Sequence, residues 1–265
     1  MSLSKVPSSE YTDDYYKNAC QGFDEYSSSL GKELPPRLSI PLNLANLQPN
    51  LNVLDIGCGR GELLIHVLLK GSKVYGVDYA VSSMRIAKDT LNNSLKNPES
   101  ESVHLQQSDA RYLPFASETM DIIFMLDVVE HLYPAELKQA FTEVARVLKP
   151  GGKLIIHTMP NLWYYNLGYP LFRVFKRLSG EILPKNPRDR FPYNHLHVNE
   201  QTPLRLKKYL ENTKLTSKVW MKTTQDYSYE KNKVVVWFMK LLVNVYPIKY
   251  IFCNDIFAIA TKSRH

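Results

Sequence analysis

The sequence predicts an α/β fold in which a doubly wound, mostly parallel β-sheet is covered by helices on both faces. Two observations carry this prediction. Short apolar runs alternate with helical patterns at the spacing of β-α-β units, and the first of these runs opens through a glycine-rich turn into a helix. Right-handed crossovers between parallel strands then restrict the possible topologies.

Five strands and the helices between them account for residues 51–160. We expect the strands near 51–56, 73–78, 102–107, 120–126 and 153–158. A helix near 135–148 ends before Pro150-Gly151-Gly152, which supplies a stop and a turn. After the fifth strand the alternation breaks, and a helix over 202–215 and strands at 218–223 and 256–261 are expected to complete the sheet.

The run VLDIGCGRGEL at 53–63 predicts a ligand site made of backbone. Val53, Leu54 and Ile56 form a short apolar strand, and glycines follow at 57, 59 and 61. Glycine permits a positive φ and lets a ligand approach the main chain closely. The helix that follows offers unpaired N–H groups to the same ligand.

A second strand, KVYGVD at 73–78, ends in Asp78. A carboxylate at this place can accept hydrogen bonds from both hydroxyls of a ribose. The turn and Asp78 together therefore predict a site for an adenosine-type cofactor.

The wider sequence resembles the class I S-adenosylmethionine-dependent methyltransferases. Its glycines follow the pattern G-x-G-x-G, whereas dinucleotide folds use G-x-G-x-x-G. The segments SDARYLPF (108–115), MDIIFMLDVVEHL (120–132) and VARVLKPGGKLIIHTMPN (144–161) follow in that family's order and spacing. The resemblance implies a seven-stranded Rossmann-like methyltransferase fold with strand order 3-2-1-4-5-7-6, the last strand antiparallel, and S-adenosylmethionine as the cofactor, with S-adenosylhomocysteine as its product.

The resemblance also implies a set of cofactor-binding residues. Gly57, Cys58 and Gly59 would line the methionine portion, and Asp55 would orient that turn or reach the cofactor's amino group. Asp78 would hold the ribose, and Asp109, followed by Ala110, would accept a hydrogen bond from the adenine amino group. The remaining candidates are Tyr79 and Met84 on either side of the adenine, although both suit a core equally, and Leu126 and Val128 at the end of the fourth strand.

Asp127, Glu130 and His131 are the candidate catalytic residues. His131 titrates near neutrality and can accept a proton from a hydroxyl nucleophile, with Glu130 or Asp127 orienting it. The alternative is that His131 packs against the cofactor and only shapes the pocket. His157, which ends the fifth strand at the same rim, is expected to be structural.

Substrate-facing residues are expected in the N-terminal segment and before the helix at 202. Tyr16, together with Tyr15 or Tyr26, is a candidate to cover the site, and these tyrosines can equally be half-buried surface residues. His195 and His197 are two residues apart, which would point both to one side of an extended segment. With Glu200 or Glu130 they could form a metal pair, but a lone His-x-His is poor evidence, and no metal is predicted.

Length and composition favour one domain with additions. The chain has 265 residues, with 44% apolar and 22% charged residues, as in ordinary globular proteins. We expect a single methyltransferase domain over 1–265, with an N-terminal helical flap at 1–45 that Pro35 and Pro36 close, and cap insertions at 159–200 and 226–252. The polar N-terminus and the three cysteines, which cannot all pair, predict a cytoplasmic protein with reduced thiols.

The charge distribution bears on the acceptor. Residues 1–160 carry 15 Lys and Arg against 19 Asp and Glu, a net charge of −4, whereas residues 161–265 carry 18 against 7, a net charge of +11. The basic, aromatic stretch 163–178 and the long apolar stretch 234–252 suit a protein that docks on anionic lipid and takes a small-molecule or lipid-like acceptor. A cap over the pocket or a dimer contact would explain the same features.

Other functions remain open. The basic half would also suit a nucleic-acid or protein acceptor, although Asp127-Val128-Val129-Glu130 lacks the Pro-Pro-aromatic element typical of base-amine methylation. A nicotinamide-dependent oxidoreductase shares the strand and turn but has a different glycine spacing. A protein that binds a nucleoside cofactor without catalysis would show the same motifs.

Overall fold

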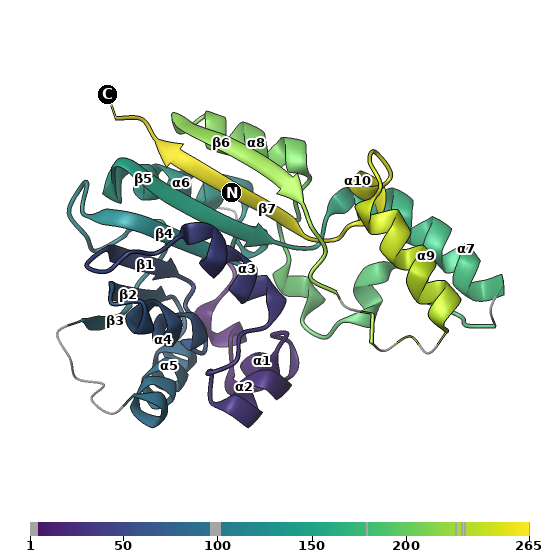
Figure 1. The fold of residues 1–265 in the computed structure, drawn as a ribbon, viewed down its shortest axis with the longest axis horizontal. Coiled ribbons are helices and arrows are strands. Elements are labelled where there is room, and N and C mark those ends of the chain that lie inside the picture. The colour runs from purple at the N-terminus through teal and green to yellow at the C-terminus, as the bar shows by residue number, and fades with distance from the viewer. Residues whose placement is uncertain are drawn as a thin grey trace.

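One seven-stranded sheet organises the chain in the computed structural model, which describes residues 5–95, 102–178, 180–225, 227–228, 230 and 232–264 (Figure 1). The strand order is β3-β2-β1-β4-β5-β7-β6, and β7 runs antiparallel to both β5 and β6, which confirms the predicted fold. The strands are β1 (Asn52–Ile56), β2 (Lys73–Asp78), β3 (Val103–Gln107), β4 (Met120–Leu126), β5 (Leu148–Thr158), β6 (Leu215–Met221) and β7 (Ile256–Lys262).

Helices cover both faces of this sheet. On one face α3 (Pro36–Ala45), α4 (Glu62–Leu69) and α5 (Val81–Ser94) pack around an apolar cluster that includes Leu64 and Phe124. On the other face α6 (Pro134–Val147) and α8 (Pro203–Glu211) enclose a cluster around Phe141. Because the central strands are buried on both faces, their sequences are nearly continuous apolar runs, which is why they could be located from sequence.

The turn after β1 depends on two glycines. Gly57 has φ of 73°, and a Cβ there would lie 2.4 Å from Val128 Cγ2. Gly61 has φ of 82°, and its Cβ would lie 3.1 Å from Ala87 Cα in α5. These glycines let the turn pack directly against the end of β4 and against α5.

The described part of the N-terminal flap, which excludes residues 1–4, folds as 3-10 turn η1 (Ser8–Glu10), α1 (Asp13–Asn18) and α2 (Phe23–Ser29). Buried Arg60, from the glycine turn, holds this flap: its guanidinium donates to Tyr16 O at 2.9 Å and to Gln21 O at 3.0 Å. Pro35 and Pro36 do not end a helix as expected. Pro36 is instead the first residue of α3, where its missing N–H costs nothing.

The two insertions form a cap beside the sheet, which we define as the π-helical turn Tyr164–Gly168, α7 (Tyr169–Leu178), α9 (Lys233–Asn244) and α10 (Lys249–Phe252). Figure 1 shows α7, α9 and α10 grouped together and projecting away from the sheet. The cap has its own apolar cluster around Met239 and Val243. Residues 179, 226, 229 and 231 lie outside the described residues. Short 3-10 turns at Val129–His131, Pro187–Arg190 and Asn194–Leu196 complete the elements.

Candidate functional site

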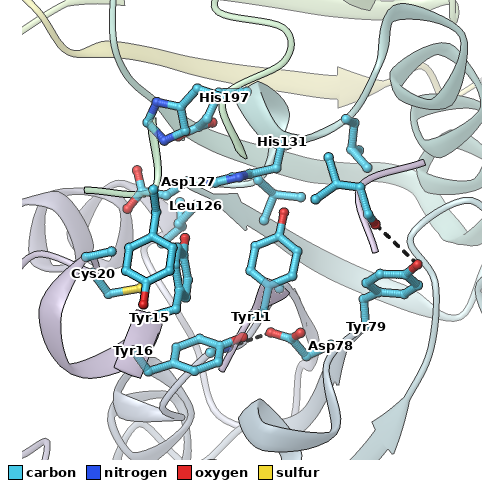
Figure 2. Close-up of a pocket in the computed structure, with 18 of the residues that line it drawn as sticks. Tyr11, Tyr15, Tyr16, Cys20, Asp78, Tyr79, Leu126, Asp127, His131 and His197 are labelled. Atoms are coloured by element: carbon cyan, nitrogen blue, oxygen red, sulfur yellow. Dashed lines mark hydrogen bonds between the residues drawn. The ribbon is translucent and has the colours of Figure 1, made fainter. Parts of the chain in front are cut away.

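A cavity of about 440 Å³ lies at the carboxyl ends of β1, β2 and β4, where open α/β sheets bind ligands. Its walls come from the glycine turn, the strand ends and the N-terminal flap. Figure 2 shows side chains from these segments pointing into a common space, with Asp78 on one side and His131 and His197 on the other.

Asp78 links two strands at the floor of this cavity. Its Oδ2 accepts a hydrogen bond from Gly59 N at 3.0 Å, and its Oδ1 accepts one from Ala80 N at 2.9 Å. Burial raises the pKa of this carboxyl, although the backbone donors oppose that effect. The side chain lines the cavity, where the oxygens of a carboxylate can accept hydrogen bonds from the hydroxyls of a ligand.

Lys5 lies between a flat ring and a carboxylate at one end of the cavity. Its ammonium nitrogen is 3.7 Å from the centroid of the Tyr79 ring and 2.7 Å from Asp109 Oδ2. Arg111 also donates to both Asp109 oxygens. Burial alone would raise the pKa of Asp109, but these donors lower it to about 2. A cationic nitrogen donor, the ammonium of Lys5, therefore already occupies the space between Tyr79 and Asp109.

Three tyrosines of the flap form the roof. Tyr11, Tyr15 and Tyr16 all line the cavity, and Figure 2 shows the ring of Tyr11 between Asp78 and His131. Burial raises the pKa of each phenol, so all three remain neutral. Neutral aromatic faces beside a carboxylate suit a cation such as a sulfonium.

His131 is uncharged and lacks a partner on one nitrogen. Its buried Nδ1 has no hydrogen-bond partner among the described residues. Burial, with His197 close by, lowers the pKa of His131 to about 3. The rings of His131 and His197 are 4.9 Å apart, and burial lowers the pKa of His197 to about 4. The cavity therefore presents a neutral imidazole acceptor.

A charged network lies directly behind this imidazole pair. Asp127 accepts from His157 Nδ1 at 2.5 Å and from Arg37 Nη1 at 2.6 Å. His157 Nε2 also lies 3.1 Å from Asp255 Oδ1. Burial alone would lower the pKa of His157, but Asp127 and Asp255 raise it to about 10. His157 and Arg37 hold the pKa of Asp127 well below its usual range, although burial of this carboxyl opposes them.

Comparison with known proteins finds a methyltransferase domain. The model of the methyltransferase domain family matches residues 54–156, which contain the glycine turn, Asp78, Asp109 and the segment 127–131. Over this region the chain is similar to S-adenosylmethionine-dependent methyltransferases.

Curated methyltransferases share part of the sequence of this chain. It is 27% identical over 163 residues to sterol 4-C-methyltransferase strm-1 of Caenorhabditis elegans, a match that covers 57% of this chain and 47% of the relative. It is 34% identical over 115 residues to a ubiquinone biosynthesis O-methyltransferase of Bartonella tribocorum, a match that covers 43% of each. The chain spans less than half the length of these two relatives.

Solved structures share its fold. Phosphoethanolamine N-methyltransferase 2 of Haemonchus contortus, in complex with S-adenosyl-L-methionine, aligns with a TM-score of 0.64 at 18% identity over 97% of this chain and 60% of that one. A geranyl diphosphate methyltransferase aligns with a TM-score of 0.56 at 16% identity over 86% of this chain and 78% of that one.

The residues that line the cavity fit a sulfonium nucleoside. Gly57 and Gly59 line the cavity with backbone, and Asp78 lies beside them and accepts from Gly59 N. Lys5 places a nitrogen donor against Tyr79 and Asp109, where the adenine is expected. Asp55 faces the same cavity, and burial raises the pKa of its carboxyl to about 8.

The structure brings most of the expected site residues together. The predicted residues that line the cavity are Asp55, Gly57, Cys58, Gly59, Asp78, Tyr79, Asp109, Ala110, Leu126, Asp127, Val128, Glu130, His131, Tyr16 and His197. Tyr16 lies beside Gly59, with its ring 3.7 Å from the place a Cβ would take there, and so faces the cofactor end of the cavity.

Met84 and His195 are not part of this cavity, which corrects two expectations. Met84 packs against the apolar cluster under α4 because its place on α5 faces the sheet. His195 is 59% exposed and pairs with Glu10, because a 3-10 turn at Asn194–Leu196 replaces the expected extended segment. Residues two apart in such a turn do not share a side, so only His197 faces His131.

The expected pairing of His131 with an acidic partner is also corrected. Asp127 has φ of 57°, which turns its carboxylate toward His157 and Arg37. Glu130 accepts from Thr158 Oγ1 at 2.7 Å. Burial, with Asp127 nearby, raises the pKa of Glu130 to about 8. Within the described residues, neither carboxyl is hydrogen-bonded to the side chain of His131.

Sequence reasoning missed Lys5, Tyr11 and Arg37. Lys5 and Tyr11 lie in the flap, where tyrosines and charges alternate without a period that would distinguish those facing the site. Arg37 follows the Pro35-Pro36 pair, and its role depends on where α3 crosses β4 and β5. Only the expectation that an N-terminal flap covers the site pointed to this region.

Three ligand-type side chains gather at the acceptor end. The possible ligand atoms of Glu130, His131 and His197 all lie within 4.8 Å of one another, a separation that a cation can bridge. Glu200, the other carboxylate considered from sequence, pairs instead with Arg188.

Stability should fall at alkaline pH because of His157. A histidine whose folded pKa of about 10 exceeds its unfolded value of 6.5 stabilises the fold fully below the unfolded value and loses that contribution as the pH rises toward the folded value. We expect the Tm of the wild type to drop across this window. His157→Gln should have a lower Tm at neutral pH and a flatter profile, measured by differential scanning calorimetry. Parallel profiles for the two proteins would contradict the charged state assigned to His157, and His104→Gln on exposed β3 is the control.

Proposed function

We propose that this methyltransferase transfers the methyl group of S-adenosylmethionine to a small, lipid-like acceptor. The observation that carries the proposal is the uncharged imidazole of His131, which faces the same cavity as Asp78 and the glycine turn. A cofactor cradle and a neutral proton acceptor in one enclosed space are what methylation of a hydroxyl or an acidic carbon requires.

In this proposal, alignment of the acceptor with the methyl group of the cofactor supplies most of the rate acceleration. When bound, S-adenosylmethionine supplies an electrophilic methyl group, so no nucleophilic side chain of the protein is needed. Asp78 and the backbone at Gly57 and Gly59 fix the nucleoside, and Tyr11, Tyr15 and Tyr16 exclude water above it. Holding two reactants in line contributes on the order of 7 to 11 kcal/mol.

His131 removes the acceptor's proton in this proposal. Its free Nδ1 is buried and neutral, so it can accept a hydrogen bond from an acceptor hydroxyl and take the proton as the methyl group moves. The imidazolium formed would be stabilised by the Asp127 carboxylate, whose charge raises the pKa of His131. Glu130 shapes the pocket through Thr158.

The relatives support an apolar, small-molecule acceptor. Two of them are named for a sterol and for ubiquinone biosynthesis, and one solved neighbour is named for geranyl diphosphate. These are low-polarity or isoprenoid molecules. A cap with a large apolar surface next to the reaction cavity is what such an acceptor would require.

We further propose that the outer face of the cap contacts an anionic membrane from the cytoplasmic side. Leu171, Val174 and Leu178 on α7 are 58–84% exposed, and Trp237 on α9 is 64% exposed. Exposed cations at Arg177, Lys233 and Lys240 belong to the same two helices. Apolar side chains interleaved with cations suit the interface of an anionic bilayer. None of the described helices is long and apolar enough to cross a bilayer.

Asp78→Ala should weaken cofactor binding about tenfold or more. Hydrogen bonds to a charged carboxylate contribute about 1.5 to 3 kcal/mol each, and the variant also frees Gly59 N and Ala80 N from their acceptor. Calorimetric titration with S-adenosylhomocysteine measures the dissociation constant. Asp89→Ala, which removes an exposed carboxylate on α5, should bind as the wild type does. An unchanged constant in Asp78→Ala would remove this residue from the site.

Incubation with methyl-labelled S-adenosylmethionine and a cell extract tests the acceptor class. We expect label in the fraction extracted by organic solvent, and its appearance in nucleic acid or protein instead would refute a lipid-like acceptor.

In the same assay His131→Gln should lower the turnover rate roughly 100- to 10,000-fold while S-adenosylhomocysteine binds normally. His104→Gln serves as the matched control. Wild-type turnover in His131→Gln would leave His131 no role as a base.

Co-sedimentation with liposomes tests the membrane contact. The wild type should sediment with vesicles of phosphatidylcholine and phosphatidylglycerol and remain in solution with phosphatidylcholine alone. Trp237→Glu should lose this binding. Val81→Glu, which changes an exposed position of α5 away from the cap, should keep it. No sedimentation with either vesicle would end the membrane proposal.

A further inference from the structure

A second cavity, of about 200 Å³, lies beneath the cap. Met239, Leu242 and Val243 of α9 form one wall, and Phe172 of α7 and Phe252 of α10 contribute others. The inner face of the cap therefore does not pack completely, and an open space remains beneath it.

The second cavity adjoins the reaction cavity. Gln21, Met159, Tyr165 and Phe191 line both, so these four side chains are the partition between the two spaces. Within the partition, Gln21 Nε2 lies 3.7 Å from Met159 Sδ. A thioether is a weak acceptor and the methionine chain is flexible, so little free energy opposes opening this contact.

The lining of the second cavity suits an uncharged, apolar ligand. Most of its side chains are aliphatic or aromatic, and none of the described residues around it is acidic. Its cation, Arg190, lies over the rings of Tyr169 and Phe191, 6.0 Å and 5.8 Å from their centroids. A site built for an anion would instead direct such a guanidinium at the ligand.

The volume of the second cavity sets the length of chain that fits. A cavity of about 150 Å³ holds one benzene molecule, so 200 Å³ accommodates a hydrocarbon of roughly one to two isoprene units. A rigid multi-ring system would not fit in the same space without movement of the cap.

We propose that the cavity beneath the cap binds an apolar chain of the methyl acceptor, an isoprenoid or an aliphatic segment of similar length. The acceptor's reactive head would lie at His131 in the main cavity, and the chain would pass the partition at Gln21 and Met159. The position of the head rests on the proposed methyl transfer, whereas binding of the chain does not.

The test is a calorimetric titration with geraniol, a ten-carbon isoprenoid alcohol, carried out with and without S-adenosylhomocysteine. Leu242→Trp fills the cavity beneath the cap, and Leu241→Trp places the same ring on the outer face of α9, where Leu241 is 41% exposed. Thr223→Trp, which enters the cavity from the segment after β6, keeps the test valid if Leu242→Trp does not fold.

We expect the wild type and Leu241→Trp to bind geraniol, and Leu242→Trp and Thr223→Trp to bind it about tenfold more weakly or not at all, with S-adenosylhomocysteine affinity unchanged in all four. No geraniol binding by the wild type, or equal binding by all variants, would overturn the proposal. So would an equal loss in Leu241→Trp. Failure to bind S-adenosylhomocysteine would count against the proposed methyl transfer and leave the geraniol result to be judged separately.

Discussion

The carboxylate of Asp78 is the interaction on which the site depends. It ends β2 and accepts the backbone N–H of Gly59 from the turn that ends β1, so two neighbouring strands are joined at their carboxyl edge. The turn can lie there only because Gly57 brings no Cβ against Val128. Burial of a carboxylate is costly unless hydrogen-bond donors compensate, and here the backbone N–H groups of Gly59 and Ala80 do so at the edge of the cavity. The proposed cofactor binding and the observed strand geometry therefore depend on the same side chain.

The acceptor end is organised by two carboxyls whose environments differ. Asp127 is surrounded by Arg37 and His157, which favour its charged form, whereas Glu130 is buried next to that charge and has a raised pKa. Neighbouring acids whose pKa values are separated in this way recur in sites that carry out acid–base catalysis. The carboxylate of Asp127 is hydrogen-bonded to His157 and Arg37, so His131 faces the cavity without a carboxylate partner. Burial keeps its imidazole neutral. The cap then adds an apolar space beside a site that is otherwise polar and aromatic.

Sequence was sufficient for the sheet and for the position of the glycine turn and Asp78 at its carboxyl edge. Strands buried on both faces are continuous apolar runs, and the glycines and Asp78 lie next to them in the chain, so local sequence placed them correctly. It was insufficient where position depends on tertiary contacts. The turn at Asn194–Leu196 separates His195 from His197, and the left-handed backbone at Asp127 directs its carboxylate away from His131. Neither conformation has a local sequence signal. Arg37 and Lys5 reach the site from segments that sequence could only describe as a flap.

A crystal structure with S-adenosylhomocysteine tests the account most directly. The account predicts the nucleoside across the carboxyl ends of β1, β2 and β4, its ribose hydroxyls hydrogen-bonded to Asp78, its adenine against Tyr79 in the space now held by the ammonium of Lys5, and its sulfur directed toward His131. A nucleoside bound elsewhere, or a crevice that stays empty at saturating concentration, would contradict it.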